Sequence, residues 1–139
     1  MSESQERRAL PNVGDRASRT LTFTPETVAR FADLVGDHNP LHLDADFAAG
    51  TQFGRPIVHG MLVAGLISAI IGEELPGVGA IYLGQTLRFV APVYVGDTVT
   101  ATGEVTAVRA EKRIITLRTE CARADGTQVI IGEATVKVM

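Results

Sequence analysis

Cysteine is almost absent from this sequence, since Cys121 is the only one among 139 residues. An intrachain disulfide is therefore excluded, and a reducing compartment suits the chain. The first eight residues are mostly polar or charged, and they lack the apolar core of a secretory signal peptide. From these two absences we expect a cytoplasmic protein.

A basic run or basic face is also missing, and the net charge is −3. Nucleic acid is therefore not expected as a partner. Apolar residues make up 45% of the chain and charged residues 21%, which is an ordinary globular composition. The length suffices for one domain with a real core but not for two. We expect a flexible N-terminal segment over residues 1–16 and a single domain over 17–139.

The run of fifteen residues from Ile57 to Ile71 carries no formal charge. Its apolar side chains point in every direction around a helical wheel, which is typical of a helix wrapped by other structure. At a rise of about 1.5 Å per residue it would measure roughly 22 Å, which is too short to cross a bilayer. We therefore expect a buried core helix and no membrane association. Gly60, Ala64 and Ser68 recur along it at four-residue spacing and form a small face that can admit a backbone or a ligand.

The residues before this run predict a strand and two helices. Residues 20–23 alternate polar and apolar, as a short strand does. A helix follows, because Thr24 is a good N-cap before a proline and Gly36 is a good C-terminal stop. Asp44 is placed to cap a second, short helix that extends to Ala49.

The residues after this run predict an antiparallel sheet. Residues 81–89 form the first strand, and period-two alternation then indicates half-buried strands over 98–108, 113–123 and 130–138. Several inward positions carry residues too small to fill a core: Ala101, Gly103, Ala107, Gly132 and Ala134. These small residues leave room for a helix to pack closely against the sheet, and the apolar helix is the natural candidate. The predicted architecture is an α+β domain of the hot-dog type, an antiparallel sheet wrapped around a long central helix, whose exposed sheet edges dimerisation would cover.

Asp37 and His42 are the strongest candidates for catalytic residues. They lie on one turn that Asn39 and Pro40 stiffen. A carboxylate and an imidazole on one loop can share a water, so that one takes a proton from it while the other supplies or relays a proton to a substrate. The alternative is that Asp37 only forms an Asx turn and that His42 is a satisfied loop histidine.

His59 and Gly60 open the central helix, where backbone N–H groups have no partner within the helix and the dipole end is positive. Such a terminus can hold a developing oxyanion, and a glycine lets a ligand approach the backbone. The alternative is that Gly60 only eases packing while His59 fills the helix entrance. Ser68 lies two turns further on, and it can bond either a ligand or its own helix carbonyl.

A metal site is not expected. His38 and His42 lie four residues apart with acids nearby, but Pro40 between them spoils the helical geometry that would aim both rings one way. Cys121 falls on an apolar strand face, where core packing is its expected role.

Two segments together resemble the MaoC-like hot-dog family, and within it the (R)-specific enoyl-CoA hydratases, called hydratase 2, of the kind that feed polyhydroxyalkanoate synthesis. The first runs from Gly36 to His42 and the second from Arg55 to Met61; segments 81–85 and 93–97 are also similar. The similarity extends roughly from Leu21 to the end of the chain.

The resemblance implies a set of roles. Asp37 and His42 would activate a water and manage the proton added at the α-carbon, and the Gly60 amide would bind the thioester oxygen. Ser68 would support the catalytic pair, and Asn39 and His59 are further substrate-binding candidates. The family fold implies a homodimer that binds an acyl-CoA thioester without a metal or redox cofactor, with the acyl chain in a tunnel beside the helix that Leu66, Ile67 and Ile71 would line.

Three other functions stay open. The same chemistry could serve acyl carrier protein substrates, as in a 3-hydroxyacyl-ACP dehydratase of fatty acid synthesis. The fold also hosts thioesterases, although the Asp37–His42 motif argues against one. Finally, the chain could be a non-catalytic acyl-CoA-binding subunit.

Overall fold

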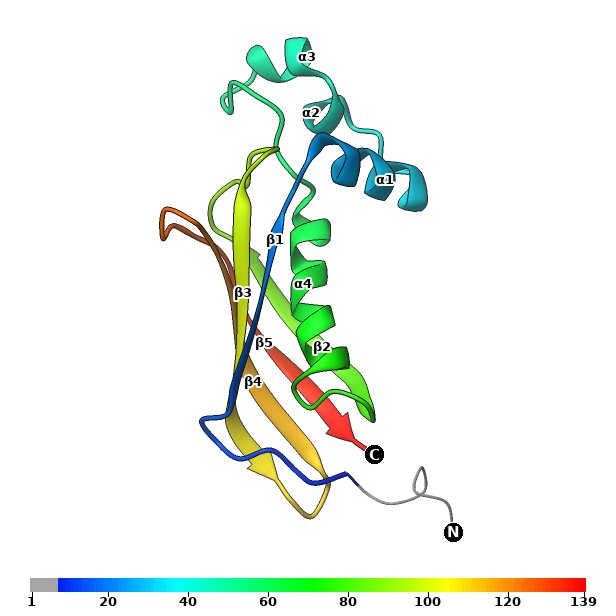
Figure 1. The fold of residues 1–139 in the computed structure, drawn as a ribbon, viewed down its shortest axis with the longest axis vertical. Helices are drawn as coiled ribbons and strands as arrows, with labels where there is room; N and C mark the ends of the chain where they lie inside the picture. The colour runs from blue at the N-terminus through cyan, green and yellow to red at the C-terminus, as the bar shows by residue number, and fades with distance from the viewer. Residues whose placement is uncertain (1–7) are drawn as a thin grey trace.

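The computed structural model describes residues 8–139, and Figure 1 shows their arrangement. Its antiparallel sheet has the strand order β1-β3-β4-β5-β2, so β1 and β2 form the two edges. The strands are β1 (Arg16–Thr22), β2 (Ala80–Phe89), β3 (Thr98–Arg109), β4 (Ile114–Arg123) and β5 (Gln128–Val138).

The long helix α4 (Gly60–Glu73) lies along one face of this sheet. Three shorter helices gather beyond the first turn of α4, at one end of the molecule (Figure 1): α1 (Pro25–Val35), α2 (Pro40–Leu43) and α3 (Ala45–Ala49). The α+β architecture of a sheet around a central helix is confirmed. Among the described residues, no helix combines the length and the apolar character that a membrane crossing requires.

The helix ends follow local signals. The Thr24 side chain caps α1 by accepting a hydrogen bond from the N–H of Thr27, and Gly36 ends the helix with a φ of 82°. Asp44 caps α3, as expected. Pro40 begins the short helix α2 rather than only interrupting the chain, because a proline loses nothing in a first turn, where its N–H would be unpaired.

The inner face of the sheet carries the small residues on which the fold prediction depended. Ala101 and Ala134 are fully buried, and a Cβ added to Gly103 would lie 3.6 Å from the side chain of Ile70 on α4. The helix can therefore approach the sheet closely. Ala107 differs from the prediction and is exposed, because the pairing of β3 with β4 shifts between Val105 and Ala107.

The central helix is not wrapped on all sides. Ile67, Ile70 and Ile71 are buried against the sheet, but Met61 is 61% exposed, and Gly65, Ser68 and Gly72 are exposed with it. These four residues fall on one stripe of α4. They remain open because a single sheet covers only one side of the helix.

The expected flexible segment over residues 1–16 lies partly outside the described residues, which begin at Arg8. Strand β1 starts at Arg16, four residues before the predicted strand. Ahead of it, the N–H of Arg8 donates to the carbonyl of Met139, and the N–H of Gly14 donates to that of Val105. Flexibility of the segment stays a prediction, although these bonds tie residues 8–15 to the domain.

Candidate active site

The turn that carries Asp37 and His42 lies against the segment that leads into α4. Three hydrogen bonds join the two. The N–H of Ile57 donates to the carbonyl of Leu41 at 3.2 Å, and the ring Nδ1–H of His42 donates back to the carbonyl of Ile57 at 2.7 Å. At the other end of the turn, the ring Nε2–H of His59 donates to the carbonyl of Asp37 at 3.0 Å. The turn is therefore held at both ends next to the helix start.

These bonds also determine the protons on the two rings. A backbone carbonyl only accepts, so neutral His42 carries its proton on Nδ1 and keeps a free lone pair on Nε2. By the same argument His59 carries its proton on Nε2. The remaining nitrogen of His59, Nδ1, is buried and has no partner among the described residues. Burying such an atom without a hydrogen bond costs about 1–3 kcal/mol.

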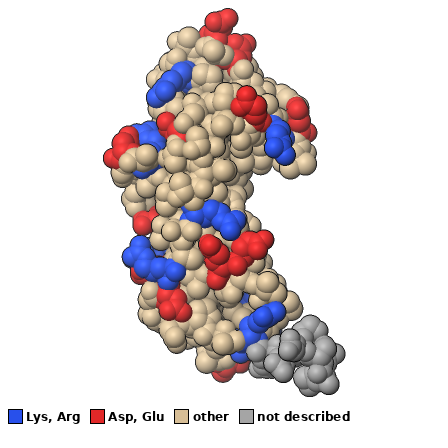
Figure 2. All heavy atoms as spheres, in the orientation of Figure 1, with Lys and Arg blue, Asp and Glu red and all other residues tan. Residues whose placement is uncertain are grey.

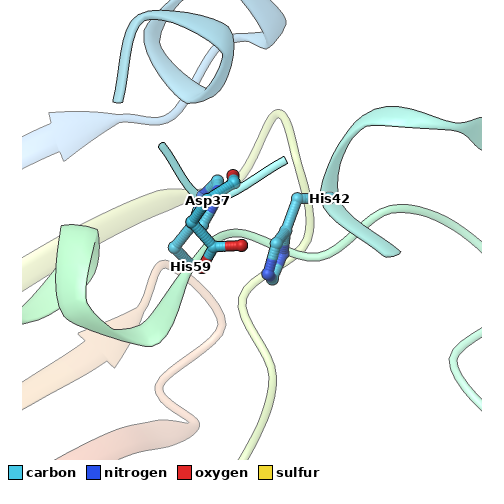
Figure 3. Close-up of side chains that lie close together, drawn as sticks. All are labelled: Asp37, His42 and His59. Atoms are coloured by element: carbon cyan, nitrogen blue, oxygen red, sulfur yellow. The ribbon is translucent and has the colours of Figure 1, made fainter. Parts of the chain in front are cut away.

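Asp37, His42 and His59 come together in space. One carboxylate oxygen of Asp37 and one ring nitrogen of each histidine lie within 4.8 Å of one another, and Figure 3 shows the Asp37 carboxylate pointing toward the His42 ring. A water with hydrogen bonds of about 2.8 Å can bridge groups up to about 5 Å apart. The pair can therefore hold one water between a carboxylate and an imidazole.

The same three residues make a poor metal site. The rings of His42 and His59 are stacked, with centroids 3.8 Å apart and planes at 29°. A metal ion lies close to the plane of each imidazole that binds it, and two stacked rings do not share a point near both nitrogens. The geometry therefore fits acid–base chemistry better than it fits an ion.

Gly60 forms the first residue of α4, directly beside this pair. Among residues 8–139, no acceptor meets the backbone N–H of Gly60 or Met61. A Cβ added to Gly60 would lie 2.6 Å from Cε1 of Phe89, so only a glycine fits beneath that ring. Gly60 therefore permits close packing, and its unpaired N–H leaves the oxyanion role as a prediction.

Two hollows open beside these residues. One of about 300 Å³ is mostly apolar and extends toward the end of β2 and the start of β5; it is lined by His42, Ile57, Val58, Gly60, Met61, Val63, Phe89, Ala91, Pro92, Val93, Val129 and Ile130. The other, of about 340 Å³, lies toward α1 and is lined by Phe31, Val35, Asp37, His42, His59, Gly60 and Met61. His42 and Gly60 line both, so a substrate in either hollow would meet the imidazole and the helix terminus.

The remaining predicted site residues do not join this cluster of side chains. The Asn39 side chain caps α2 by accepting from the N–H of Leu41. Ser68 lines a separate groove between α4 and β2, about 12 Å along the helix from Gly60. The predicted acyl-chain lining, Leu66, Ile67 and Ile71, is buried in the core and borders none of the hollows described. For these residues a substrate-contacting role stays a prediction.

Sequence reasoning did not find Phe31, Met61 and Phe89 as site residues. Phe31 packs against the His59 ring in a T-shaped arrangement, with centroids 4.9 Å apart. The sequence did give a hint of Phe89, because this large aromatic residue ends a predicted strand and precedes an apolar segment. Its closeness to Gly60 depends on the fold. His38 pairs with Asp33 at 2.8 Å on the surface and does not join the cluster.

Comparison with known proteins extends these observations. A model of the MaoC-like domain matches residues 9–125. The (R)-specific enoyl-CoA hydratase of Aeromonas caviae is 54% identical over 126 residues, which cover 91% of this chain and 94% of that one. The 3-hydroxybutyryl-CoA dehydratase of Methylorubrum extorquens is 50% identical over 80% of this chain and 70% of its own.

The solved structure of the A. caviae (R)-hydratase involved in PHA biosynthesis matches with a TM-score of 0.90 and 53% identity, over 93% of this chain and 98% of that chain. The fold match thus covers nearly the whole of both chains, and the family model spans the Asp37–His42 turn and the start of α4. The chain belongs to the MaoC-like domain family.

Proposed function

We propose that this protein is an (R)-specific enoyl-CoA hydratase, which adds water to trans-2-enoyl-CoA and forms (R)-3-hydroxyacyl-CoA. One observation carries the proposal: the Asp37 carboxylate and a ring nitrogen of His42 lie within 4.8 Å of each other beside the open N-terminus of α4. The bond from Nδ1 to Ile57 leaves Nε2 of His42 free for a shared water. The identity with the A. caviae hydratase supports the same reaction and the same stereochemistry.

The proposed reaction uses these groups in one sequence. Nε2 of His42 accepts a proton from the water, while Asp37 accepts the second hydrogen bond and orients it. The water oxygen bonds to the β-carbon, and the electron pair of the double bond shifts toward the thioester oxygen. The N–H of Gly60 stabilises the charge that develops there. The α-carbon then takes up the proton that left the water, which balances the addition.

The proposed active form is a homodimer that binds the acyl-CoA thioester. The open stripe of α4 faces a groove of about 390 Å³ that includes Ser68 and edge-strand residues such as Tyr82 and Leu83. Strand β2 forms a sheet edge and exposes several large apolar side chains, which a second copy would cover. Such a partner would also close one wall of a tunnel beside Ser68.

The proposal also covers the partners, the cellular location and the domain bounds of the enzyme. On the face drawn in Figure 2, acidic and basic side chains are interspersed rather than gathered in a basic patch, which supports the expectation of no nucleic-acid partner. A cytoplasmic location and a domain over 17–139 belong to the proposal as well. Cell fractionation tests the first of these.

The test is the loss of the enoyl-thioester absorbance when the purified protein meets crotonyl-CoA, followed by chiral analysis of the product. We expect a rapid loss and the (R)-3-hydroxy thioester. An (S) product, or no loss with any short or long enoyl-CoA, would contradict the proposal. Matched acyl carrier protein thioesters test the dehydratase alternative, and the release of free thiol from saturated acyl-CoA tests the thioesterase alternative. Tight acyl-CoA binding without turnover would instead indicate a binding subunit.

A further inference from the structure

His59 is a buried polar side chain to which the proposed reaction gives no task. The residue is 3% exposed and occupies the N-cap position of α4, but its side chain does not cap the helix. Its ring stacks on His42, with centroids 3.8 Å apart, and packs against Phe31 in a T-shaped arrangement, with centroids 4.9 Å apart. A phenylalanine would fill the same space, and it would not bury the unpartnered Nδ1 that His59 leaves there. Something other than packing must account for the imidazole.

A hydrogen bond to the turn shows what the His59 imidazole supplies. Its Nε2–H donates to the backbone carbonyl of Asp37 at 3.0 Å, across 22 residues of sequence. We propose that His59 is a positioning residue, which holds Asp37 at the distance from His42 that a shared water requires. This inference rests on the hydration reaction proposed above, in which Asp37 and His42 act on one water.

The two ends of the turn differ in how they are held. At the His42 end, two bonds to Ile57 fix the ring and the backbone. At the Asp37 end, the carboxylate accepts a hydrogen bond from just one described residue, the N–H of Asn39 within the turn itself, and the side chain is exposed. The preceding Gly36 has a φ of 82°, a conformation that allows the chain to change direction there. The bond from His59 is thus the one hydrogen bond that joins Asp37 to a described residue outside the turn.

Loss of this tie should therefore displace Asp37 and leave His42 in place. Misplacement of a reacting group by about 1 Å lowers a rate by about 100-fold. Neither Asp37 nor His59 lines the apolar hollow of about 300 Å³, and the free N–H of Gly60 takes no part in this bond. The effect should thus fall on kcat, with little change in KM.

Two variants at position 59 separate the bond from the packing. His59→Phe keeps an aromatic ring between Phe31 and His42 but loses the donor. His59→Gln loses the ring, but its amide places a donor near the former Nε2. His38→Gln is the matched control, because His38 lies on the same turn and its ring points to Asp33 at the surface.

For His59→Phe we expect kcat to fall roughly 10- to 100-fold with KM within about 3-fold, and the melting temperature to stay equal or rise. His59→Gln should recover most of the lost kcat, and His38→Gln should match the wild type. Wild-type kcat in the Phe variant, or a Gln variant no more active than the Phe variant, would overturn the assignment.

A measurement that does not depend on enzyme activity tests the role of His59 separately from the proposed reaction. Heteronuclear NMR of the imidazole and backbone groups should find the His59 proton on Nε2 in the wild type. In His59→Phe the Asp37 resonances should shift or broaden while those of Ile57 stay unchanged. If the wild type hydrates no enoyl thioester, the proposed function fails, and the Asp37 resonances still decide the His59 assignment. Unchanged Asp37 resonances would refute it, whatever the activity. If the Phe variant does not fold, the same comparison is made with His59→Ala, which also removes the donor.

Discussion

The ring Nδ1–H of His42 donates to the backbone carbonyl of Ile57, fifteen residues later in the chain, at 2.7 Å. This bond leaves Nε2 of His42, with its free lone pair, as the ring atom available for proton transfer. It also ties the turn that carries Asp37 to the segment that begins α4. The proposed acid–base pair and the helix terminus are thus positioned by the same few backbone groups.

The first prediction concerns His42→Asn. The amide nitrogen of asparagine can occupy the position of Nδ1 and keep the bond to Ile57, but nothing replaces Nε2. We expect kcat to fall at least about 100-fold, as is usual when a general acid–base group is removed. Steady-state kinetics with crotonyl-CoA measure the loss, and an unchanged melting temperature shows that the turn is intact. Activity within a few-fold of the wild type would show that His42 does not carry the proton.

The second prediction concerns Asp37→Asn. The Asn side chain keeps an oxygen for the bond from the N–H of Asn39 but loses the negative charge. We expect a fall in kcat of about 100- to 10,000-fold, because the water loses its anionic acceptor. The Asx turn should survive, so circular dichroism and thermal melting should match the wild type. Asp33→Asn, an exposed acid near the end of α1, is the control and should retain full activity.

The third prediction concerns Gly60→Ala. The new methyl group would meet the ring of Phe89 at 2.6 Å, so the ring must move, at a cost of about 1–3 kcal/mol. We expect a lower melting temperature and reduced kcat/KM. The double variant Gly60→Ala with Phe89→Leu separates the causes, since it should recover stability if the clash with the ring dominates. Failure to recover stability would indicate strain elsewhere at the helix start.

The fourth prediction concerns the proposed dimer. Leu83 is 52% exposed, lies at an irregularity in the pairing of β2 with β5, and borders the groove beside Ser68. Leu83→Arg would bury a charge in the interface, so we expect the mass from light scattering to fall from two chains to one. The matched control is Leu34→Arg on α1, where the leucine is 84% exposed and outside the groove. A dimer in both variants would place the interface elsewhere.

The fifth prediction concerns Cys121, which is fully buried on β4. Burial, with the nearby charge of Glu120 as a smaller cause, raises the pKa of this thiol from 9.0 to about 12. Above pH 9 the unfolded chain ionises its thiol while the folded chain does not. This difference leaves the free energy of unfolding unchanged below pH 9. As the pH rises from 9 toward 12, it lowers the free energy of unfolding by about 1.4 kcal/mol per pH unit.

Urea unfolding of the wild type and of Cys121→Ala at several alkaline pH values measures this decline. The variant lacks the thiol and should show a shallower loss of stability. Burial also raises the pKa of Tyr82, but this effect is common to both proteins and cancels in the comparison. Parallel curves would contradict the shifted pKa. In the native protein at neutral pH, a thiol reagent should label Cys121 only after denaturant is added.

Much of the fold could be predicted because its signals are local. Thr24 and Gly36 bound α1 through bonds that span only a few residues, and the alternation in β3, β4 and β5 placed most inward side chains correctly. The prediction failed at Ala107 because a bulge changes the register by one residue, and one residue reverses the face. It also failed for the open side of α4, because the sequence of a helix does not indicate how many layers of structure will cover it.

The sequence alone determined the residue types of the candidate site: an acid and a histidine on one stiff turn, and a glycine at the start of an uncharged helix. The tertiary structure decided their geometry. It paired His59 with Asp37 and His42 with Ile57, and it set Phe89 against Gly60. These contacts join segments from fifteen to about thirty residues apart, and their distances depend on how the sheet, α4 and the short helices pack together. Side-chain periodicity reports which face of an element is apolar, but it carries no information about which distant residue that face will meet.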